Sequence, residues 1–409
     1  MNLLISRIFT GQKKNYKVLL LLYFSFIFLS LPFEYILAID NFVNILMLIV
    51  ALFLLHFIRY NFFNKYLLGV FLLLIGLSTI YTIAWNNNEL ASNIKLILQP
   101  LVLILSIDLC LLVSKKDINY FVTLSTNILL LFLFGAWLAF FYRAFGGPSL
   151  LQLQYEGTTY DFFLSSFVKN YWGQPFIRPA AIFDEPGTFS FIICFIAILR
   201  KSLSRNKTVT WILLLLGFVT FSLAHFIFTI FYLLSEKNIK ILKYLLILAL
   251  IFISLISISN EFQEGFERLF LYRFELVDGD NTKLIAGDNR SSHFINAYKQ
   301  LNLDSFIWGV DPICVLDKNK SIKLYGNMGE NPLWPLMSRG ILVAWPYYFI
   351  IFVYLIIGIK KKRNFLYIGF ALLLMQRPYI LDIGYALMAS LPLYVFYKNK
   401  INIKNEYRI

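Results

Sequence analysis

Residues 208–235, TVTWILLLLGFVTFSLAHFIFTIFYLLS, decide the fold because of the charges on either side of them. One helix of this length would run about 40 Å, well beyond the ~30 Å hydrocarbon core of a bilayer. Both flanks, 200–207 and 237–243, are rich in Lys and Arg, and short basic loops stay in the cytoplasm. Two cytoplasmic ends require an even number of crossings. The stretch is therefore predicted to form two short antiparallel helices with an outward turn near 222–225, although a re-entrant hairpin satisfies the same parity.

The composition predicts an all-α polytopic membrane protein. The chain is 59% hydrophobic, its mean hydropathy is +0.69, and its apolar residues fall in repeated runs. The first run lacks a cleavage site of small residues and many runs follow it, so it is interpreted as a transmembrane helix and not as a signal peptide. We expect a single integral membrane domain, 1–409, with about twelve spans of roughly 20 residues each. The predicted spans are 17–33, 41–58, 66–85, 94–113, 119–142, 181–199, 208–220, 222–234, 244–259, 340–359, 364–376 and 380–397.

The net charge of +14 is explained by this topology. Basic residues recur in the loops that alternation places inside, whereas outer and intramembrane positions hold most of the acidic ones, so both termini are expected in the cytoplasm. A charge of topological origin argues against a nucleic-acid partner. The three cysteines form no disulfide framework, and the three histidines are too scattered for a histidine-based metal site. His225 is expected to pack at a helix end.

Two long loops are predicted outside, at 143–180 and 260–339. Their composition shifts to Gly, Asp, Asn, Pro, Trp and Tyr, and long ordered loops in a protein with short connections usually carry function. Both are expected to contain short helices. One is an amphipathic helix over 261–274, and another follows a Gly-Asp-Asn turn and carries Arg290 and His293 in its first turns.

One further motif in the second loop suggests a metal. Asp278-Gly-Asp280 has the form of the metal-binding pair of glycosyltransferases that use nucleotide sugars. Nucleotide sugars are cytoplasmic, whereas this loop is predicted outside, and the pair lies within a Gly/Asn turn. No metal site is therefore assigned.

The first loop returns to the membrane through Arg178-Pro-Ala-Ala-Ile-Phe-Asp-Glu-Pro-Gly187. Arg178, Asp184 and Glu185 stand next to a span, where a buried charge costs at least ~2.5–3.5 kcal/mol. Two interpretations are open. Either the charges mark the interface while Pro186 and Gly187 start the helix, or a positioned arginine and a neighbouring carboxylate face a water-filled cavity at the outer leaflet.

Arginines gather on the predicted outer side. A planar guanidinium group binds phosphate in a bidentate way and suits that task better than lysine does. Solvated arginines that balance nearby carboxylates are the simpler explanation for Arg268 and Arg339. Arg178 and Arg290 are the better candidates for phosphate binding, and Arg273 lies near the same outer surface.

The end of the second loop offers a carboxylate and aromatic rings. Glu330 and Asn331 precede Pro332, so Glu330 either caps the next helix at its positive end or points into a cavity. Several aromatic side chains offer faces for stacking sugars, or else form an interfacial aromatic belt. These are Tyr171, Trp172, Trp308 and Trp334.

In combination, these pieces resemble the O-antigen polymerase and ligase superfamily, which holds the Wzy-type polymerases and the related WaaL-type ligases. The resemblance covers most of the chain past about residue 120, and it rests on the order and topological placement of the motifs. They are Arg-x6-Glu-Pro-Gly from Arg178 to Gly187, Thr-Phe-Ser-Leu-Ala at 220–224, Arg290 with Ala297, Trp-Gly at 308–309, and Asn331 followed by Gly340.

The resemblance implies a membrane-embedded, GT-C-like glycosyltransferase that inverts the anomeric configuration of the transferred sugar and needs neither metal nor cofactor. Such a protein lies in the bacterial inner membrane and acts on the periplasmic side. Undecaprenyl-pyrophosphate-linked oligosaccharide would serve as donor and acceptor, and a flippase and a chain-length regulator of the same pathway would be partners. The departing pyrophosphate needs cationic stabilisation, which converging arginines can supply. Candidates for binding pyrophosphate or glycan are Arg178, Arg290, Arg273, His293, Asn331, Trp172, Trp308 and Trp334.

The acceptor hydroxyl needs a base within hydrogen-bond reach. In the ligase branch a histidine precedes the Asn of the last motif, whereas Glu330 occupies that position here and the spacing to Gly340 is about one residue short. This departure disfavours the ligase. Glu185 and Glu330, together with Arg290, are the predicted catalytic residues, and Asp288 and His293 remain alternatives for the base.

Two other classes of function stay open. A flippase or other transporter of lipid-linked sugars needs charged residues along a path through the whole membrane. The predicted spans hold few charged residues, which favours an enzyme acting at one face. These residues are Asp108 and, nearer the span ends, Lys17, Lys95, Asp184, Glu185 and Asp382. A structural subunit that organises other assembly proteins is the third possibility.

Overall fold

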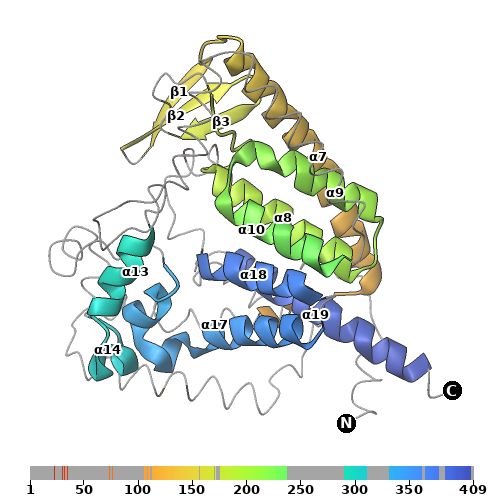
Figure 1. Cartoon of the computed structure of the whole chain (residues 1–409), viewed down its shortest axis with the longest axis vertical. Coiled ribbons are helices and arrows are strands. Elements are labelled where there is room, and N and C mark those ends of the chain that lie inside the picture. Colours follow the sequence, from red (N-terminus) through yellow and green to blue (C-terminus); the bar gives the residue numbers. More distant parts are fainter. Residues whose placement is uncertain are drawn as a thin grey trace.

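The computed structural model describes the chain mainly from residue 113 onward, and this part is mostly helical (Figure 1). The predicted span at 244–259 lies outside the described residues, and the predicted spans before residue 113 hold at most a few described positions. The described blocks are 113–155, 157–169, 171, 176–236, 290–310, 331–361, 364–376 and 383–406, with single positions at 23, 30, 32, 35, 73, 76, 106, 107, 109 and 110.

The helical segments agree with the predicted spans. Every predicted span that falls on described residues from 113 onward is confirmed as helix, although the ends differ by several residues. The helices are α7 (Lys115–Ala144), α8 (Pro186–Ser202), α9 (Lys207–Leu216), the 3-10 helix η1 (Gly217–Thr220), α10 (Leu223–Ser235), α13 (Arg290–Lys299), α14 (Leu303–Trp308), α17 (Trp334–Lys360), α18 (Phe365–Gln376) and α19 (Ile383–Glu406).

The start of α8 shows why one boundary differs. The sequence predicts a span from residue 181, but Ala181 has a left-handed backbone with φ of 54°, which no helix interior accommodates. Pro186 is the first helical residue, and proline suits this position because it has no N–H to leave unsatisfied and its φ is already helical. The helix therefore begins at Pro186.

Among the described residues, α7 is the one helix long and apolar enough to cross a membrane. Shorter apolar helices follow it, over Lys207–Thr220, Leu223–Ser235, Ala344–Lys360 and Phe365–Gln376. Along one side of α7 the large apolar side chains of Leu131, Phe134 and Leu138 are exposed. A face of this kind suits contact with lipid or with further apolar helices better than contact with water.

The residues 208–235 form the predicted pair of antiparallel helices. At the base of the pair, Lys207 Nζ lies 2.8 Å from Glu236 Oε2, although these residues stand at opposite ends of the segment. Midway, the rings of Trp211 and Tyr232 meet edge to face with centroids 5.1 Å apart. The chain reverses at Phe221, whose φ of 45° is left-handed. Both ends of the pair therefore lie on the same side, as the basic flanks require.

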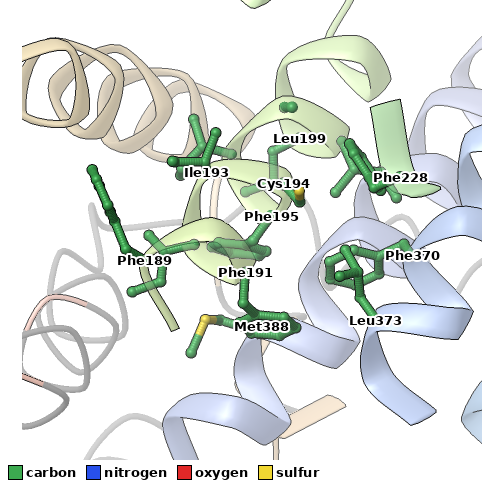
Figure 2. Close-up of a cluster of buried hydrophobic side chains, with 14 of the residues drawn as sticks. Phe189, Phe191, Ile193, Cys194, Phe195, Leu199, Phe228, Phe370, Leu373 and Met388 are labelled. Carbon is green, nitrogen blue, oxygen red and sulfur yellow. The ribbon is translucent and has the colours of Figure 1, made fainter. Parts of the chain in front are cut away.

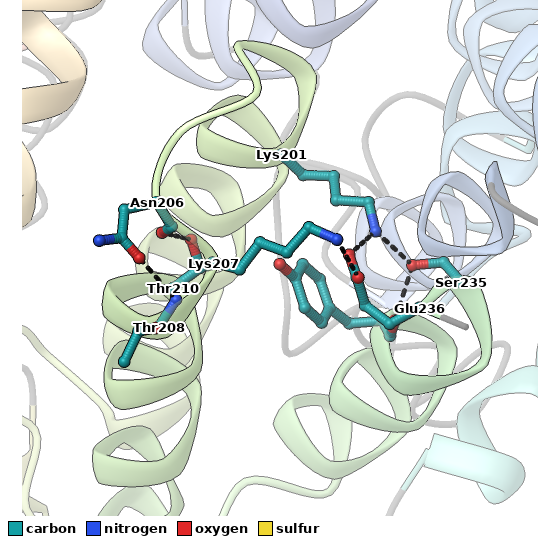
Figure 3. Close-up of polar contacts among 8 residues, drawn as sticks. Lys201, Asn206, Lys207, Thr208, Thr210, Ser235 and Glu236 are labelled. Carbon is teal, nitrogen blue, oxygen red and sulfur yellow. Dashed lines mark hydrogen bonds and ion pairs between the residues drawn. The ribbon is translucent and has the colours of Figure 1, made fainter. Parts of the chain in front are cut away.

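Glu236 ties this base to the preceding helix as well. Its carboxylate, only 3% exposed, accepts hydrogen bonds from Lys207 and from Lys201 at the end of α8 (Figure 3). Lys201 also donates to Ser235 Oγ at 3.2 Å. The carboxylate of Glu236, at the end of α10, thus joins the end of α8 to the start of α9.

Helix α8 is the centre of the bundle and packs on α7, α9, α10, α18 and α19. Its residues from Phe189 to Leu199 are buried on every side, and they meet Phe228 of α10, Phe370 of α18 and Met388 of α19 (Figure 2). The ring of Phe191 stacks on Phe370 with centroids 5.9 Å apart. Because α8 has no polar face, it is surrounded by apolar neighbours and not by water.

The basic helix ends gather at one end of the bundle. Ser202 Oγ and Tyr367 Oη are 2.7 Å apart, Arg205 donates to the Asn119 carbonyl at 3.2 Å, and Lys398 donates to a main-chain carbonyl just before α7 at 3.4 Å. Loops that alternation predicts on the same side do therefore lie together. The basic residues of these helix ends are Lys115, Lys116, Arg200, Lys201, Arg205, Lys207, Lys360, Lys361 and Lys398.

The first long loop does not match its prediction. Short helices were expected within 143–180, but residues 151–169 form an antiparallel sheet of three strands, β1 (Leu151–Tyr155), β2 (Thr158–Phe163) and β3 (Ser166–Lys169), in that order. The strict alternation Leu-Gln-Leu-Gln-Tyr in β1 has the two-residue period of a strand. In the second long loop, the described residues 290–310 do contain two short helices, α13 and α14. The predicted helix over 261–274 lies outside the described residues.

We predict that Glu236→Gln destabilises the protein by about 1–3 kcal/mol at neutral pH, between the values for exposed and buried ion pairs. Burial raises the pKa of the Glu236 carboxyl, but the hydrogen bonds and charges of Lys201 and Lys207 together lower it by more. The pKa therefore lies below its ordinary value of 4.5. The stabilisation is therefore complete above about pH 4.5 and is lost as the pH falls through the depressed pKa.

Thermal unfolding of the purified protein in detergent, followed between about pH 3.5 and 7, measures both effects. Asp304→Asn is the control, because Asp304 is exposed on α14. If Glu236→Gln unfolded at the same temperature as the control across this range, the ion pair would not close the helix pair.

Candidate functional site

Arg178 fastens the first long loop to the turn between α9 and α10. Its Nε donates to the carbonyl oxygen of Thr220 at 3.3 Å, and its Nη2 donates to that of Phe221 at 3.3 Å. The 3-10 helix η1 ends here and Phe221 is left-handed, so these carbonyls have no helical partner. The structure thus brings together two of the segments that carry the resemblance, Arg178 to Gly187 and residues 220–224.

Aromatic packing holds the same turn from the side of α7. The ring of Phe140 lies 5.8 Å from that of Phe221 and stacks on Phe176 at 5.4 Å. Trp137 Nε1 donates to the Leu216 carbonyl at 3.0 Å, at the point where α9 gives way to η1. The C-terminal part of α7 and the Arg178 segment therefore pack around the helix break.

The Glu185 carboxylate, close to Arg178 in the sequence, does not cap helix α8. Glu185 is the N-cap residue of α8 and its main-chain oxygen accepts from Thr188 N at 3.1 Å, but its side chain makes no capping hydrogen bond. Pro186 begins the helix, so this part of the interface interpretation is confirmed. The Glu185 side chain is half-buried. Its role as a proton acceptor stays a prediction.

His225 packs at the start of α10, as predicted, and fixes the inner side of the turn. It is fully buried; Nε2 lies 2.8 Å from the Leu214 carbonyl and Nδ1 lies 3.6 Å from Cys194 Sγ. A Cβ on Gly217 would come within 2.4 Å of the imidazole. Only glycine therefore lets the imidazole reach this carbonyl.

A second group of predicted residues forms around the start of α17. Asn331 is fully buried; its Oδ1 accepts from Leu333 N at 2.8 Å and its Nδ2 donates to the His293 carbonyl at 3.5 Å. This side chain therefore joins α13 to the first turn of α17. The small apolar core around it consists of Ala297, Val310 and Met337, with Leu301, Leu333 and Trp334 packed against them.

Gly340 allows α14 to approach this core closely. Its backbone angles, φ 67° and ψ 169°, interrupt α17, and such angles are open to glycine alone. A Cβ here would lie 2.0 Å from the carbonyl oxygen of Ile307. The Trp308-Gly309 pair ends α14 at the same place, with φ of 86° at Gly309. The described motif residues Ala297, Trp308, Gly309, Asn331 and Gly340 therefore lie in one packed unit.

The structure locates some of the other candidates and leaves the rest undescribed. Arg290 is the first residue of α13, but its side chain is outside the described residues. His293 and Trp308 are half-buried, and Trp334 packs against the small core, which favours a packing role over sugar stacking. The candidates that lie wholly outside the described residues, and stay predictions, are Glu330, Arg273, Trp172, Asp288, Arg268 and the pair Asp278 and Asp280.

The functional groups that the predicted site offers near the turn between α9 and α10 are the guanidinium group of Arg178 and the carboxylate of Glu185. Arg178 carries a positive charge, because a guanidinium group stays protonated near neutral pH. Within the described residues, no group of three or more His, Cys, Asp or Glu side chains is placed to hold a metal ion. The main-chain carbonyls that Arg178 binds were not foreseen, since the left-handed backbone of Phe221 has no signal in the sequence.

No protein-family model, no curated protein sequence and no solved structure matches this chain. The resemblance to the polymerase and ligase superfamily therefore rests on the motifs themselves. In the structure, motif residues that are far apart in the sequence meet in two compact groups. One forms around Arg178 and the turn at Phe221, and the other around Asn331 and Gly340.

We predict that Gly340→Ala destabilises the protein by at least about 3 kcal/mol, because it adds a steric clash to a strained backbone. Gly146→Ala is a matched control. Gly146 also has a positive φ, 86°, but a Cβ there meets nothing within 4 Å among the described residues. This control should cost only about 1 kcal/mol, the price of the backbone conformation.

Denaturant or thermal unfolding in detergent compares the two variants. Equal losses of stability would show that α14 does not press on the backbone of α17 at residue 340.

Proposed function

We propose that the chain is a Wzy-type polysaccharide polymerase, a membrane-embedded glycosyltransferase of the bacterial inner membrane. It transfers the growing glycan from undecaprenyl pyrophosphate onto a new lipid-linked repeat unit at the periplasmic face. The observation that carries the proposal is the contact between Arg178 and the main chain at Thr220 and Phe221. It joins two motifs of the resemblance and sets a cation at a helix break.

The distribution of charge supports this orientation. Basic helix ends gather at one end of the bundle, joined by contacts such as Arg205 with Asn119 and Ser202 with Tyr367. If that end faces the cytoplasm, the break at Phe221 and the sheet 151–169 face outward. About twelve spans with both termini inside complete the proposed topology.

The chemistry follows from the groups at the outward end. An acceptor hydroxyl attacks the anomeric carbon of the donor, its C–O bond to phosphate breaks, and the electron pair leaves with the pyrophosphate. Arg178 and Arg290 stabilise the negative charge on this leaving group. Glu185 or Glu330 takes the proton of the acceptor hydroxyl. Attack from the side opposite the leaving group inverts the anomeric configuration.

The direct test is elongation by the purified protein in detergent, supplied with lipid-linked repeat units of its own host. We expect the wild type to make a ladder of longer chains. Arg178→Ala and Arg290→Ala should lower the rate at least about 100-fold, the usual cost of removing a group that stabilises a leaving or developing anion. Arg178→Lys should recover part of the rate, because it keeps the charge but loses the two-pronged geometry.

Arg205→Ala is the matched control, since Arg205 binds a main-chain carbonyl at the basic end, away from the proposed site. It should elongate as the wild type does. Wild-type ladders from both Arg178→Ala and Arg290→Ala would remove the arginines from the mechanism. A wild type that moves lipid-linked sugars across vesicles, but makes no ladder in detergent, would be a transporter.

A further inference from the structure

The sheet at the outer end of α7 contains a buried carboxylate that the proposed reaction does not use. Asp161 lies in β2 opposite Gln152 of β1 and is only 3% exposed. Its Oδ1 accepts from Gln152 Nε2 at 3.4 Å, whereas Oδ2 has no hydrogen-bond partner among the described residues. A buried carboxylate oxygen that accepts no hydrogen bond lowers the stability of the fold, so its presence here needs an explanation.

Other polar groups surround this carboxylate on the same face of the sheet. The ring of Tyr171 meets Phe163 edge to face at 5.0 Å, and the Arg143 guanidinium lies over the Tyr171 ring at 5.1 Å. Burial raises the pKa of the Tyr171 phenol, Arg143 lowers it and Asp161 raises it. Asp161 is two residues before Phe163 in β2, so its side chain lies on the same face of the sheet as the ring that Tyr171 meets.

Hydrogen bonds join the sheet to α7 and to the segment that carries Arg178. Ser165 Oγ, in the turn between β2 and β3, donates to the Gly135 carbonyl of α7 at 2.7 Å. On the far edge, Phe167 N donates to the Ala181 carbonyl at 2.8 Å and Ala180 N donates to the Phe167 carbonyl at 2.9 Å. Asp161 and Arg178 thus share one frame at the outward end of the bundle.

We propose that Asp161, with Gln152, Tyr171 and Arg143, is a saccharide-binding subsite. A carboxylate accepts hydrogen bonds from sugar hydroxyls, an amide and a guanidinium group donate to them, and an aromatic ring packs on the apolar face of a pyranose. Gln152 is exposed and Tyr171 is half-buried, so the cluster reaches the surface at these two residues. This inference rests on the proposed function, and it identifies the cluster as the part of the polymerase that binds the glycan.

A subsite beside the reaction centre keeps the glycan near it between rounds of transfer. A ligand held at two points dissociates far less often than one held at a single point. The subsite should therefore raise the number of repeat units added before release. Its loss should shorten the chains.

The test uses the purified full chain and oligosaccharides of one and two repeat units, released by mild acid from lipid-linked units of the host. Titration calorimetry measures their affinity, and the ladder in detergent gives the chain length. Asp161→Asn keeps the size of the side chain but removes its charge, and we expect at least about tenfold weaker binding, the usual worth of a hydrogen bond to a charged group, together with shorter chains. Asp304→Asn, which removes an exposed carboxylate on α14, should change neither.

Gln152→Ala guards against a mere folding defect, because Gln152 is exposed and its loss leaves the apolar core intact. It should weaken binding in the same direction at a temperature at which thermal unfolding shows the variant to be fully folded. If Asp161→Asn and Gln152→Ala bind the oligosaccharides and elongate them as the wild type does, the subsite is wrong and the polymerase proposal stands. If the wild type makes no ladder but both variants bind less well, the polymerase proposal fails and the saccharide site survives.

Discussion

A helix that breaks among apolar neighbours must find partners for the backbone groups that the break releases, and this constraint organises the turn between α9 and α10. The paired helices α9 and α10 break at Phe221, where Arg178 binds two of the released carbonyls. On the other side of the turn, His225 lies within hydrogen-bond distance of a third carbonyl, that of Leu214. Because Arg178 stands just before α8, the same contacts fix the path of the first long loop into the bundle.

Much of the helical architecture can be predicted from the sequence, because charge and hydropathy set it. The basic flanks of residues 208–235 require both ends on one side, and the ion pair between Lys207 and Glu236 joins these ends as that argument demands. Hydropathy alone locates α18 to within one residue and the start of α19 to within three, although α19 runs nine residues past its predicted end. The sheet 151–169 is different, since its strands are short and its alternating pattern competes with the general expectation of helices in a membrane protein.

The candidate site is less predictable, because its geometry depends on contacts between distant residues. The sequence singles out Arg178, Asn331 and Gly340, but it does not reveal what each one does. Asn331 holds α13 against α17 through its amide, and Gly340 is needed where the carbonyl of Ile307 leaves no room for a Cβ. Arg178 presents the same contrast, since a cation suited to phosphate also serves as a structural donor to the main chain. Asp161 gave no signal at all, because a single aspartate in a loop is unremarkable until its burial is known.

The central claim is that the basic helix ends face the cytoplasm while the break at Phe221 and the sheet face outward. Single cysteines placed at Phe145, which is 84% exposed beyond the end of α7, and at Lys361, exposed at the basic end, test it in a chain without its native cysteines. A membrane-impermeant maleimide applied to intact cells should label position 145, and it should reach position 361 only after the membrane is opened. Labelling of position 361 but not 145 in intact cells would contradict the account.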